Sequence, residues 1–509
     1  MASTKKNSSS PILATEILQE IFKYIRDLQT LFSCLLVNRQ WCRTVIPILW
    51  RDPFEKGPSP TIIQLYVRSL PESARCRLKE AGINQISDCI GSTIFEYPSL
   101  LKRLRFGDIS NSINAWLTPS KIKIDIQDKI KSSEVLREIL TLILQSVDSL
   151  DELIIEIYKA QFAEISKSNF VFPEFDGVDE PLKNIRKLHF KGNYLSQDLW
   201  KPMTEKMTEI THFRIDSSMF SNNDQEFAAN FIKKQKNLAH LCLSRNGCWD
   251  ALASLAVIGK SIRTLCFFKL DFEFIDERAI KGLKACINLR AVDLEYCLHC
   301  DSLGLIEAVK TFQNLKYFAC LSERRTMPTE IVKTVLETSG NKLEFLFLNP
   351  LSWDTMVHQE IIDSLITNGQ TLKFLELSGL HEVDTGRILS ACPNLIDFIF
   401  CAHGNSNLEM MTKIAKTAPP TLRHLRININ GHQMSIAIFR IFLENLQIKL
   451  ESFHVGAPYP ENLKAFLNSN GIKDTYPPGR VEVLRKKFIP TFGLEENRFA
   501  RIPEEFGGR

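Results

Sequence analysis

Apolar residues recur at helical spacing through the first fifty positions of the chain. The first run places them on one face of a helix: Ile17, Leu18, Ile21, Phe22 and Ile25. Asp27 and Asn38 precede a second and a third such run, where their side-chain oxygens can cap the first helical turn. Pro47 predicts the end of the third helix. Three short amphipathic helices can scarcely close their own core, so part of this apolar surface is expected to face a partner.

Beyond residue 95, a short alternation of the form L-x-x-L-x-L recurs thirteen times, from "LLKRLRF" to "KLESFHV". From Ile185 to Leu450 these phrases are spaced by a mean of 26.5 residues over ten intervals. Between them the period becomes helical, as in residues 330–340 and 359–369, which both end on a glycine that can stop a helix. Each unit is therefore expected to be a short strand followed by a helix, and stacked units should bury a continuous core.

Side chains alternate between the two faces of a strand, so the positions between the apolar ones should line a second, concave face. The start of this face is basic, with Arg103 and Arg105. Its middle is aromatic and acidic, and we predict that it binds a target protein through Asp293, Glu295, Tyr317, Phe345, Phe347, Phe374, Glu376 and Asp397. Exposed aromatic residues beside charges are typical of protein interfaces. The alternative is that Phe345 and Phe347 only pack against neighbouring units or loops.

Length and composition narrow the class of protein. The 509 residues exceed one ordinary core, which indicates several domains or an open repeat array. The net charge of +4 does not argue for a nucleic-acid or membrane surface, and we see neither a membrane span nor a secretory signal. Thirteen cysteines, scattered through apolar stretches, indicate buried thiols in a reducing compartment. We expect a cytoplasmic or nuclear protein that binds neither nucleic acid nor membrane.

The N-terminal residues resemble an F-box, whose pattern is roughly L-P-x-E-I-L, I-F, V-x-R-x-W and L-W. Residues 11–54 carry this series in order, except that Ala14 stands in place of the usual proline, which would pre-set the start of the first helix. F-box proteins dock on the Skp-family adaptor of a cullin-based ubiquitin ligase. The resemblance implies that the adaptor is contacted by Leu13, Ile17, Leu18, Ile21, Phe22, Val37, Trp41, Leu49 and Trp50.

The repeated phrase resembles leucine-rich repeats, and segments 283–289 and 389–395 are similar to the cysteine-containing subtype that often follows an F-box. Together the resemblances imply an α/β chain in which a three-helix F-box precedes a leucine-rich-repeat horseshoe, with parallel strands inside and helices outside. The expected organisation is a disordered N-terminus (1–10), the F-box (11–54), a helical linker (55–95), the solenoid (96–469), and a C-terminal cap and tail (470–509).

Motifs for catalysis and metal binding are sparse. Cys297 and Cys300 form one C-x-x-C pair around His299, whereas a zinc site usually needs two pairs, so we predict no metal and no cofactor. Nucleotide-binding, hydrolase and metalloprotease motifs do not occur. We therefore interpret the chain as a non-catalytic substrate-recognition subunit of a Skp–cullin–F-box ubiquitin ligase. The alternatives are an adaptor-binding scaffold outside ubiquitin transfer and an enzyme built on the repeats.

Overall fold

A computed structural model describes the chain except for residues 1–12, 26, 90, 92, 120–124, 158–178, 193–196, 218–221, 246–247, 323–326, 351–356, 404–406, 430–434, 457–462, 475–479 and 490–509. The expected disordered N-terminus, residues 1–10, lies outside this part. The chain divides into two compact units, Met1–Leu188 and His189–Arg509. Strand β3 (Lys187–Gly192) contains the boundary between them.

The first unit begins with α1 (Thr15–Lys23), α2 (Leu28–Leu35) and α3 (Arg39–Leu49). Their apolar faces meet in a small core of Leu18, Phe22, Leu31, Cys34 and Val45, against which partly buried residues such as Trp41 and Leu49 pack. These three helices are therefore the three amphipathic helices that the apolar spacing predicts.

Both predicted helix caps are confirmed. Asp27 accepts hydrogen bonds from the backbone N–H groups of Gln29 and Thr30, and Asn38 accepts one from that of Trp41. The predicted end of the third helix at Pro47 is wrong, because α3 continues to Leu49. A proline in the last turn removes one backbone hydrogen bond, and the contact of Leu49 with the core holds the helix beyond it.

The rest of the first unit combines helices with the first strands of the chain. Its further elements are α4 (Pro60–Ser69), α5 (Glu72–Glu80), η1 (Asn84–Asp88), η2 (Tyr97–Leu100), β1 (Arg103–Arg105), α6 (Phe106–Leu117), α7 (Ile126–Ser146), β2 (Glu152–Ile157) and α9 (Asp179–Lys183). Strands β1 and β2 pair in parallel, with Leu104 opposite Leu153.

The sequence predicts that Arg103 and Arg105 make the start of the concave face basic, and this prediction is wrong. Arg105 is only 1% exposed and donates from Nε and Nη2 to Asp52, at 2.9 and 2.8 Å. Arg103 bridges the same carboxylate, at 2.9 Å, and Glu152, at 2.6 Å. Two carboxylates thus neutralise the two guanidinium groups. The network ties the segment after α3 to strands β1 and β2.

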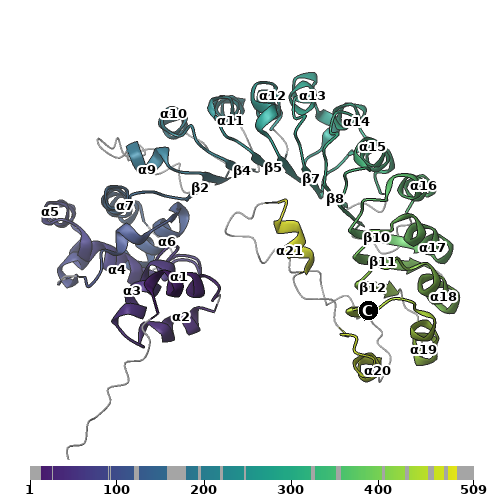
Figure 1. Ribbon diagram of the computed structural model, residues 1–509. Coiled ribbons are helices and arrows are strands. Elements are labelled where there is room, and N and C mark those ends of the chain that lie inside the picture. Colours follow the sequence, from purple (N-terminus) through teal and green to yellow (C-terminus); the bar gives the residue numbers. More distant parts are fainter. Residues whose placement is uncertain are drawn as a thin grey trace, which may run out of the picture. The chain divides into compact units, whose positions relative to one another are not determined.

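The second unit alternates strands and helices. Its strands pair in parallel in the order of the sequence: β4 (His212–Ser217), β5 (His240–Ser244), β6 (Thr264–Phe268), β7 (Ala291–Glu295), β8 (Tyr317–Ser322), β9 (Phe345–Pro350), β10 (Phe374–His381), β11 (Asp397–His403), β12 (His424–Ile429) and β13 (Ser452–Val455). Figure 1 shows these strands along one side of the unit and the connecting helices along the other.

The connecting helices are α10 (Gln197–Lys206), α11 (Asn222–Lys234), α12 (Trp249–Ile258), α13 (Glu277–Lys284), α14 (Leu303–Val309), α15 (Thr329–Ser339), α16 (Gln359–Asn368), α17 (Glu382–Ala391), α18 (Asn407–Thr417) and α19 (Ile436–Asn445), with short 3₁₀ turns η4 (Gly259–Ser261) and η5 (Phe272–Phe274). Gly340 and Gly369 are the C-caps of α15 and α16, as predicted. The helix–strand alternation that the sequence predicts is therefore confirmed.

The phrase register is also confirmed. Each of the thirteen phrases carries a strand in the described part of the chain, and the first apolar residue of every phrase is at most 1% exposed. Leu346 and Leu348 on β9, like Leu375 and Leu377 on β10, point into the core between sheet and helices and are at most 2% exposed. Their neighbours in the sequence therefore point to the other face of the sheet.

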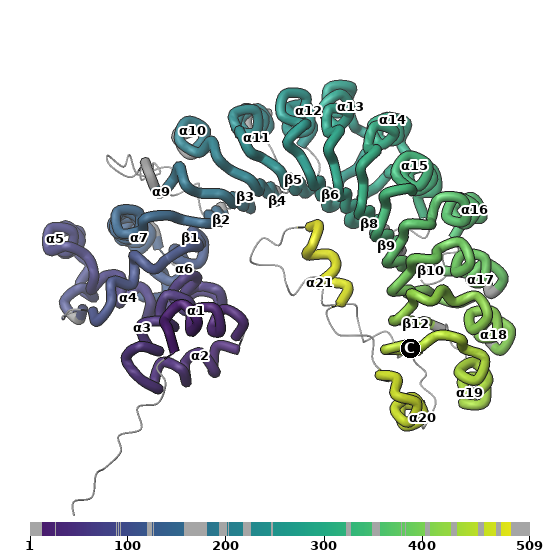
Figure 2. Tube along the Cα trace, viewed as in Figure 1, coloured from purple at the N-terminus to yellow at the C-terminus, as the bar shows by residue number. Residues whose placement is uncertain are grey.

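The C-terminal residues leave the alternation. Helix α20 (Leu463–Ser469) follows β13, and Lys473 then forms an isolated parallel bridge with Ser452 at the edge of the sheet. Helix α21 (Arg480–Lys486) lies on the strand side of the second unit, opposite its other helices (Figures 1 and 2). It therefore contacts the face of the sheet that the sequence predicts to be concave and free.

Candidate interaction surfaces

The helices α1 and α2 and the residues beside them leave apolar side chains in solvent. Their exposed fractions range from 46% to 88%, and the residues are Leu13, Ile17, Ile21, Tyr24, Phe32, Leu36 and Val37. Ile17, Ile21 and Tyr24 share one face of α1, since they are spaced by four and three residues. So many exposed apolar side chains in and beside two short helices mark an interaction site.

The nine residues predicted to bind the adaptor divide into two groups. Leu13, Ile17, Ile21 and Val37 are exposed, whereas Leu18 and Phe22 are each 1% exposed and form the core. Neighbours in a helix point about 100° apart, so Ile17 can face solvent while Leu18 faces the core.

The remaining predicted residues pack mainly inside the first unit. The ring of Trp41 meets that of Phe22 edge-on at 5.1 Å, and Leu49 packs on the same core. The ring of Trp50 lies 4.2 Å from that of Tyr97. Only the parts of the Trp41, Leu49 and Trp50 side chains that stay exposed to solvent can contact an adaptor, as the sequence predicts for these residues. The adaptor-binding residues predicted from the sequence do not include Tyr24, Phe32 or Leu36, although all three are exposed.

The start of α1 is held without the usual proline. Ala14, the N-cap residue, has φ −59° and ψ 145°, which a proline would adopt. The side chain of Gln40 donates to the carbonyl oxygen of Leu13 at 2.9 Å and to Thr15 Oγ1 at 3.3 Å. This contact from α3 fixes the position of Leu13 at the helix start.

On the sheet of the second unit, residues in register form rows across the strands. One row passes through Tyr317, Phe345, Phe374 and Asp397, and the next through Asp293, Ala319, Phe347 and Glu376. The ring centroids of Tyr317 and Phe347 are 5.1 Å apart, and those of Phe347 and Phe374 are 4.2 Å apart. The predicted alignment of the four aromatic residues is therefore confirmed. We call Tyr317, Phe345, Phe347 and Phe374 the aromatic cluster.

The prediction that this cluster is exposed is wrong. Its four side chains are between 0% and 6% exposed, because residues 480–489, which we call the C-terminal segment, cover them. The ring of Phe488 lies 5.5 Å from that of Tyr317 and 4.9 Å from that of Phe345. The segment also contributes Val481, Leu484 and Ile489 to this cluster. The alternative left open for Phe345 and Phe347, that they only pack against neighbouring units or loops, accounts for part of their environment: Phe347 stacks on Phe374 of the next strand. The C-terminal segment, which belongs to neither group, supplies the rest.

Two arginines anchor the C-terminal segment to acidic residues of the sheet. Arg480 forms a two-bond fork with Asp397, from Nε to Oδ1 at 2.5 Å and from Nη2 to Oδ2 at 2.9 Å. Arg485 donates from Nε and Nη2 to the single oxygen Oδ2 of Asp293, at 3.0 and 2.6 Å. Its Nη2 also lies 3.5 Å from Glu295 Oε2. Three of the four predicted acidic residues, Asp293, Glu295 and Asp397, thus lie beside an arginine of the same chain, and the fourth, Glu376, is half-buried.

The charges are held in a largely dry environment. The side chains of Asp293, Asp397 and Arg485 are 2%, 4% and 15% exposed. Burial by itself lowers the pKa of Arg485, but the charge of Asp293 more than offsets it, so the net pKa lies above its usual value. Burial, and then the charge of Asp293, raises the pKa of the Tyr317 phenol. Arg485 is therefore a cation and Tyr317 is neutral at physiological pH.

The contact leaves two buried polar atoms unsatisfied. Asp293 Oδ1 and the hydroxyl of Tyr317 find no hydrogen-bond partner among the residues that the structure describes. Their side chains are 2% and 0% exposed. An unsatisfied buried polar group costs about 1–3 kcal/mol. The C-terminal segment therefore fills the apolar part of this site better than its polar part.

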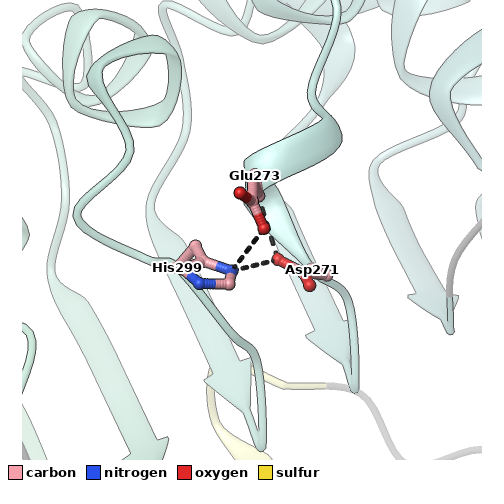
Figure 3. A group of neighbouring side chains, drawn as sticks. All are labelled: Asp271, Glu273 and His299. Carbon is pink, nitrogen blue, oxygen red and sulfur yellow. Dashed lines mark hydrogen bonds and ion pairs between the residues drawn. The ribbon is translucent and has the colours of Figure 1, made fainter.

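Asp271, Glu273 and His299 form the group in the described part of the chain that could hold a metal ion (Figure 3). Their candidate ligand atoms lie within 4.8 Å of one another. His299 Nδ1 lies 2.5 Å from Asp271 Oδ1 and 3.6 Å from Glu273 Oε2. The contact between His299 Nδ1 and Asp271 Oδ1 also fits a hydrogen bond in which the imidazole N–H donates to the carboxylate, with no metal ion involved. The sequence missed this group because its acidic members lie one repeat before the histidine.

The C-x-x-C pair beside this histidine is buried. Cys297 and Cys300 are each 5% exposed, and the Cys297 thiol donates to the carbonyl oxygen of Phe267 at 3.4 Å. Burial raises the pKa of the Cys297 thiol well above its ordinary value. These contacts describe a buried structural cysteine.

Residues 15–56 match the F-box-like domain family. No curated protein matches the chain. Within the described residues, none of the helices has the length and apolar character needed to cross a membrane. The chain therefore carries an F-box-like domain at the site of the exposed apolar residues, which fits a role in binding a Skp-type adaptor.

Proposed function

We propose that this protein is the substrate-recognition subunit of a Skp–cullin–F-box ubiquitin ligase. The observation that supports this most is that the F-box-like domain keeps Ile17 and Ile21 about half exposed, at 50% and 46%, beside a closed core. Burial of such a side chain against a partner contributes about 1.5–3 kcal/mol at most. A few of them supply enough binding energy for a stable adaptor contact.

The strand–helix array supports a target-binding role. Its parallel strands and the mean phrase spacing of 26.5 residues are those of leucine-rich repeats, so we infer a solenoid of this class. Such arrays offer an extended face to a partner. In this proposal the chain is not an enzyme. It holds a target near the catalytic subunits of the ligase and so raises the effective concentration of the target's lysines.

Reconstituted ubiquitin transfer tests this function. The intact chain is mixed with a Skp-family adaptor, a cullin and a conjugating enzyme that carries activated ubiquitin. The attachment of ubiquitin to a protein bound by the chain is then measured. Conjugation that requires Ile17 and Ile21 supports the proposal. Adaptor binding without transfer to any bound protein would favour the scaffold alternative, and turnover of a substrate by the isolated chain would favour an enzyme.

A further inference from the structure

We propose that the face of the sheet around the aromatic cluster is a peptide-binding site for a target segment that carries two arginines and aromatic or aliphatic residues between and after them. In this proposal the C-terminal segment occupies the site in the absence of a target and is displaced by one. The inference rests on the proposed function, for which it specifies the chemistry of the target.

The site has an apolar centre between two acidic ends. Asp293 lies on β7 and Asp397 on β11, four strand positions apart, which is about 19 Å across a sheet. The aromatic cluster lies on the three strands between them. A ligand therefore needs two guanidinium groups that reach both carboxylates and an apolar stretch that covers the rings. The C-terminal segment has this pattern, with Arg480, Arg485 and Phe488.

The fit of the segment differs at the two ends. Arg480 uses both oxygens of Asp397, which is the usual geometry of a strong arginine–carboxylate pair. At the other end Arg485 uses Oδ2 of Asp293, while Oδ1 and the Tyr317 hydroxyl stay unsatisfied among the described residues. A ligand with one more donor at this end would satisfy polar atoms that the segment does not. The site therefore suits a target better than it suits the segment that covers it.

Attachment to the same chain explains how an imperfect ligand can fill the site. A tethered segment acts at an effective concentration of the order of 1 mM. If the same sequence binds with a Kd of about 10 µM when free, the tether keeps the site about 99% occupied and weakens any free competitor about 100-fold. A target peptide that binds more tightly, or that is held by a second contact, can still displace the segment.

A binding assay with the full chain tests the displacement. The probe is a fluorescent peptide with the sequence of residues 480–489, RVEVLRKKFI, and its anisotropy reports binding. The release variant is Arg480→Glu with Arg485→Glu, which places like charges opposite Asp397 and Asp293. We expect it to bind the peptide about 100-fold more tightly than the unchanged chain does. The matched control, Lys233→Glu with Lys234→Glu at two exposed positions of α11, makes the same change in net charge away from the segment, and it should bind as weakly as the unchanged chain.

Three results would overturn the inference. The first is a folded release variant that does not bind the peptide. The second is equal binding of a peptide in which both arginines are alanine. The third is that two release variants both fail to fold: Arg480→Glu with Arg485→Glu, and Leu484→Ala with Phe488→Ala. The segment would then be a fixed part of the core. Adaptor binding is measured on the same samples. If the unchanged chain does not bind the adaptor, this result counts against the proposed function and not against the peptide site.

Discussion

Arg485 places two hydrogen bonds on one oxygen of Asp293, with distances of 3.0 Å from Nε and 2.6 Å from Nη2. These residues are 192 positions apart in the sequence. Their contact brings the C-terminal segment onto the face of the sheet that the repeat pattern predicts for target binding. The pair is therefore one of the contacts that hold this segment over the aromatic cluster.

The first prediction concerns this pair. Arg485→Ala removes the cation that faces a nearly buried carboxylate, and the loss of such a partner costs about 3–5 kcal/mol when the site stays dry. We expect the C-terminal segment to detach so that water reaches Asp293. Hydrogen exchange should then become faster for the amides of residues 480–488. Arg485→Lys, which keeps the charge but loses the planar fork, should give an intermediate rate. Unchanged protection in the alanine variant would show that apolar contacts alone hold the segment.

The second prediction concerns the buried ion network of the first unit. Asp52→Ala leaves Arg105, which is 1% exposed, without the carboxylate that it contacts through Nε and Nη2. We expect the free energy of unfolding to fall by about 3–5 kcal/mol. Denaturant unfolding followed by tryptophan fluorescence measures it. The control is Asp151→Ala, whose partner Arg51 is 62% exposed, and it should cost less than about 1 kcal/mol. Equal losses would contradict the distinction.

The third prediction separates two adjacent residues of α1. Phe22→Ala should destabilise the first unit by about 3–5 kcal/mol, because the side chain is 1% exposed in the three-helix core. Ile21→Ala should change stability by no more than about 0.5 kcal/mol, since Ile21 is 46% exposed, yet it should weaken adaptor binding. Thermal unfolding and adaptor titration of both variants distinguish the two roles. Adaptor binding unaffected by Ile21→Ala would place the contact elsewhere on the module.

The fourth prediction concerns pH. Burial lowers the pKa of His424, with a smaller contribution in the same direction from Arg480, while Asp397 acts in the opposite direction. Burial also lowers the pKa of His454. The unfolded chain therefore binds more protons than the folded chain once the pH falls below the ordinary histidine pKa of about 6.5. Stability should be fully present above this pH and decline as the pH falls towards 5.

The two histidines can be tested by substitution. His424→Gln with His454→Gln should reduce the decline in melting temperature between pH 7 and pH 5. The control is His358→Gln. His358 is exposed at the start of α16, so this substitution should leave the decline unchanged. A pH profile that is identical in the double variant and the unchanged protein would assign the decline to other groups.

Local patterns were sufficient for the repeat register and insufficient for the sites. The alternation of Leu346 and Phe347 follows from the two-residue period of a strand, and the sequence predicts it correctly. The separation of Ile21 from Phe22 depends on how three helices pack, because apolar residues occur on more than one face of α1. The burial of Phe347 comes from a segment more than 130 positions away, and periodicity contains no information about where such a segment docks.

Direct titration of the purified chain with a purified Skp-family adaptor tests whether the exposed residues of α1 bind that adaptor. We expect a stable complex for the unchanged protein and a loss of affinity of at least about 100-fold for Ile17→Asp with Ile21→Asp, because two carboxylates would have to be buried in an apolar contact. Val257→Asp on α12, where the native side chain is 69% exposed, is the matched control and should bind normally. Equal adaptor affinity of the unchanged chain and the Ile17→Asp/Ile21→Asp variant, or no complex with either, would contradict this expectation.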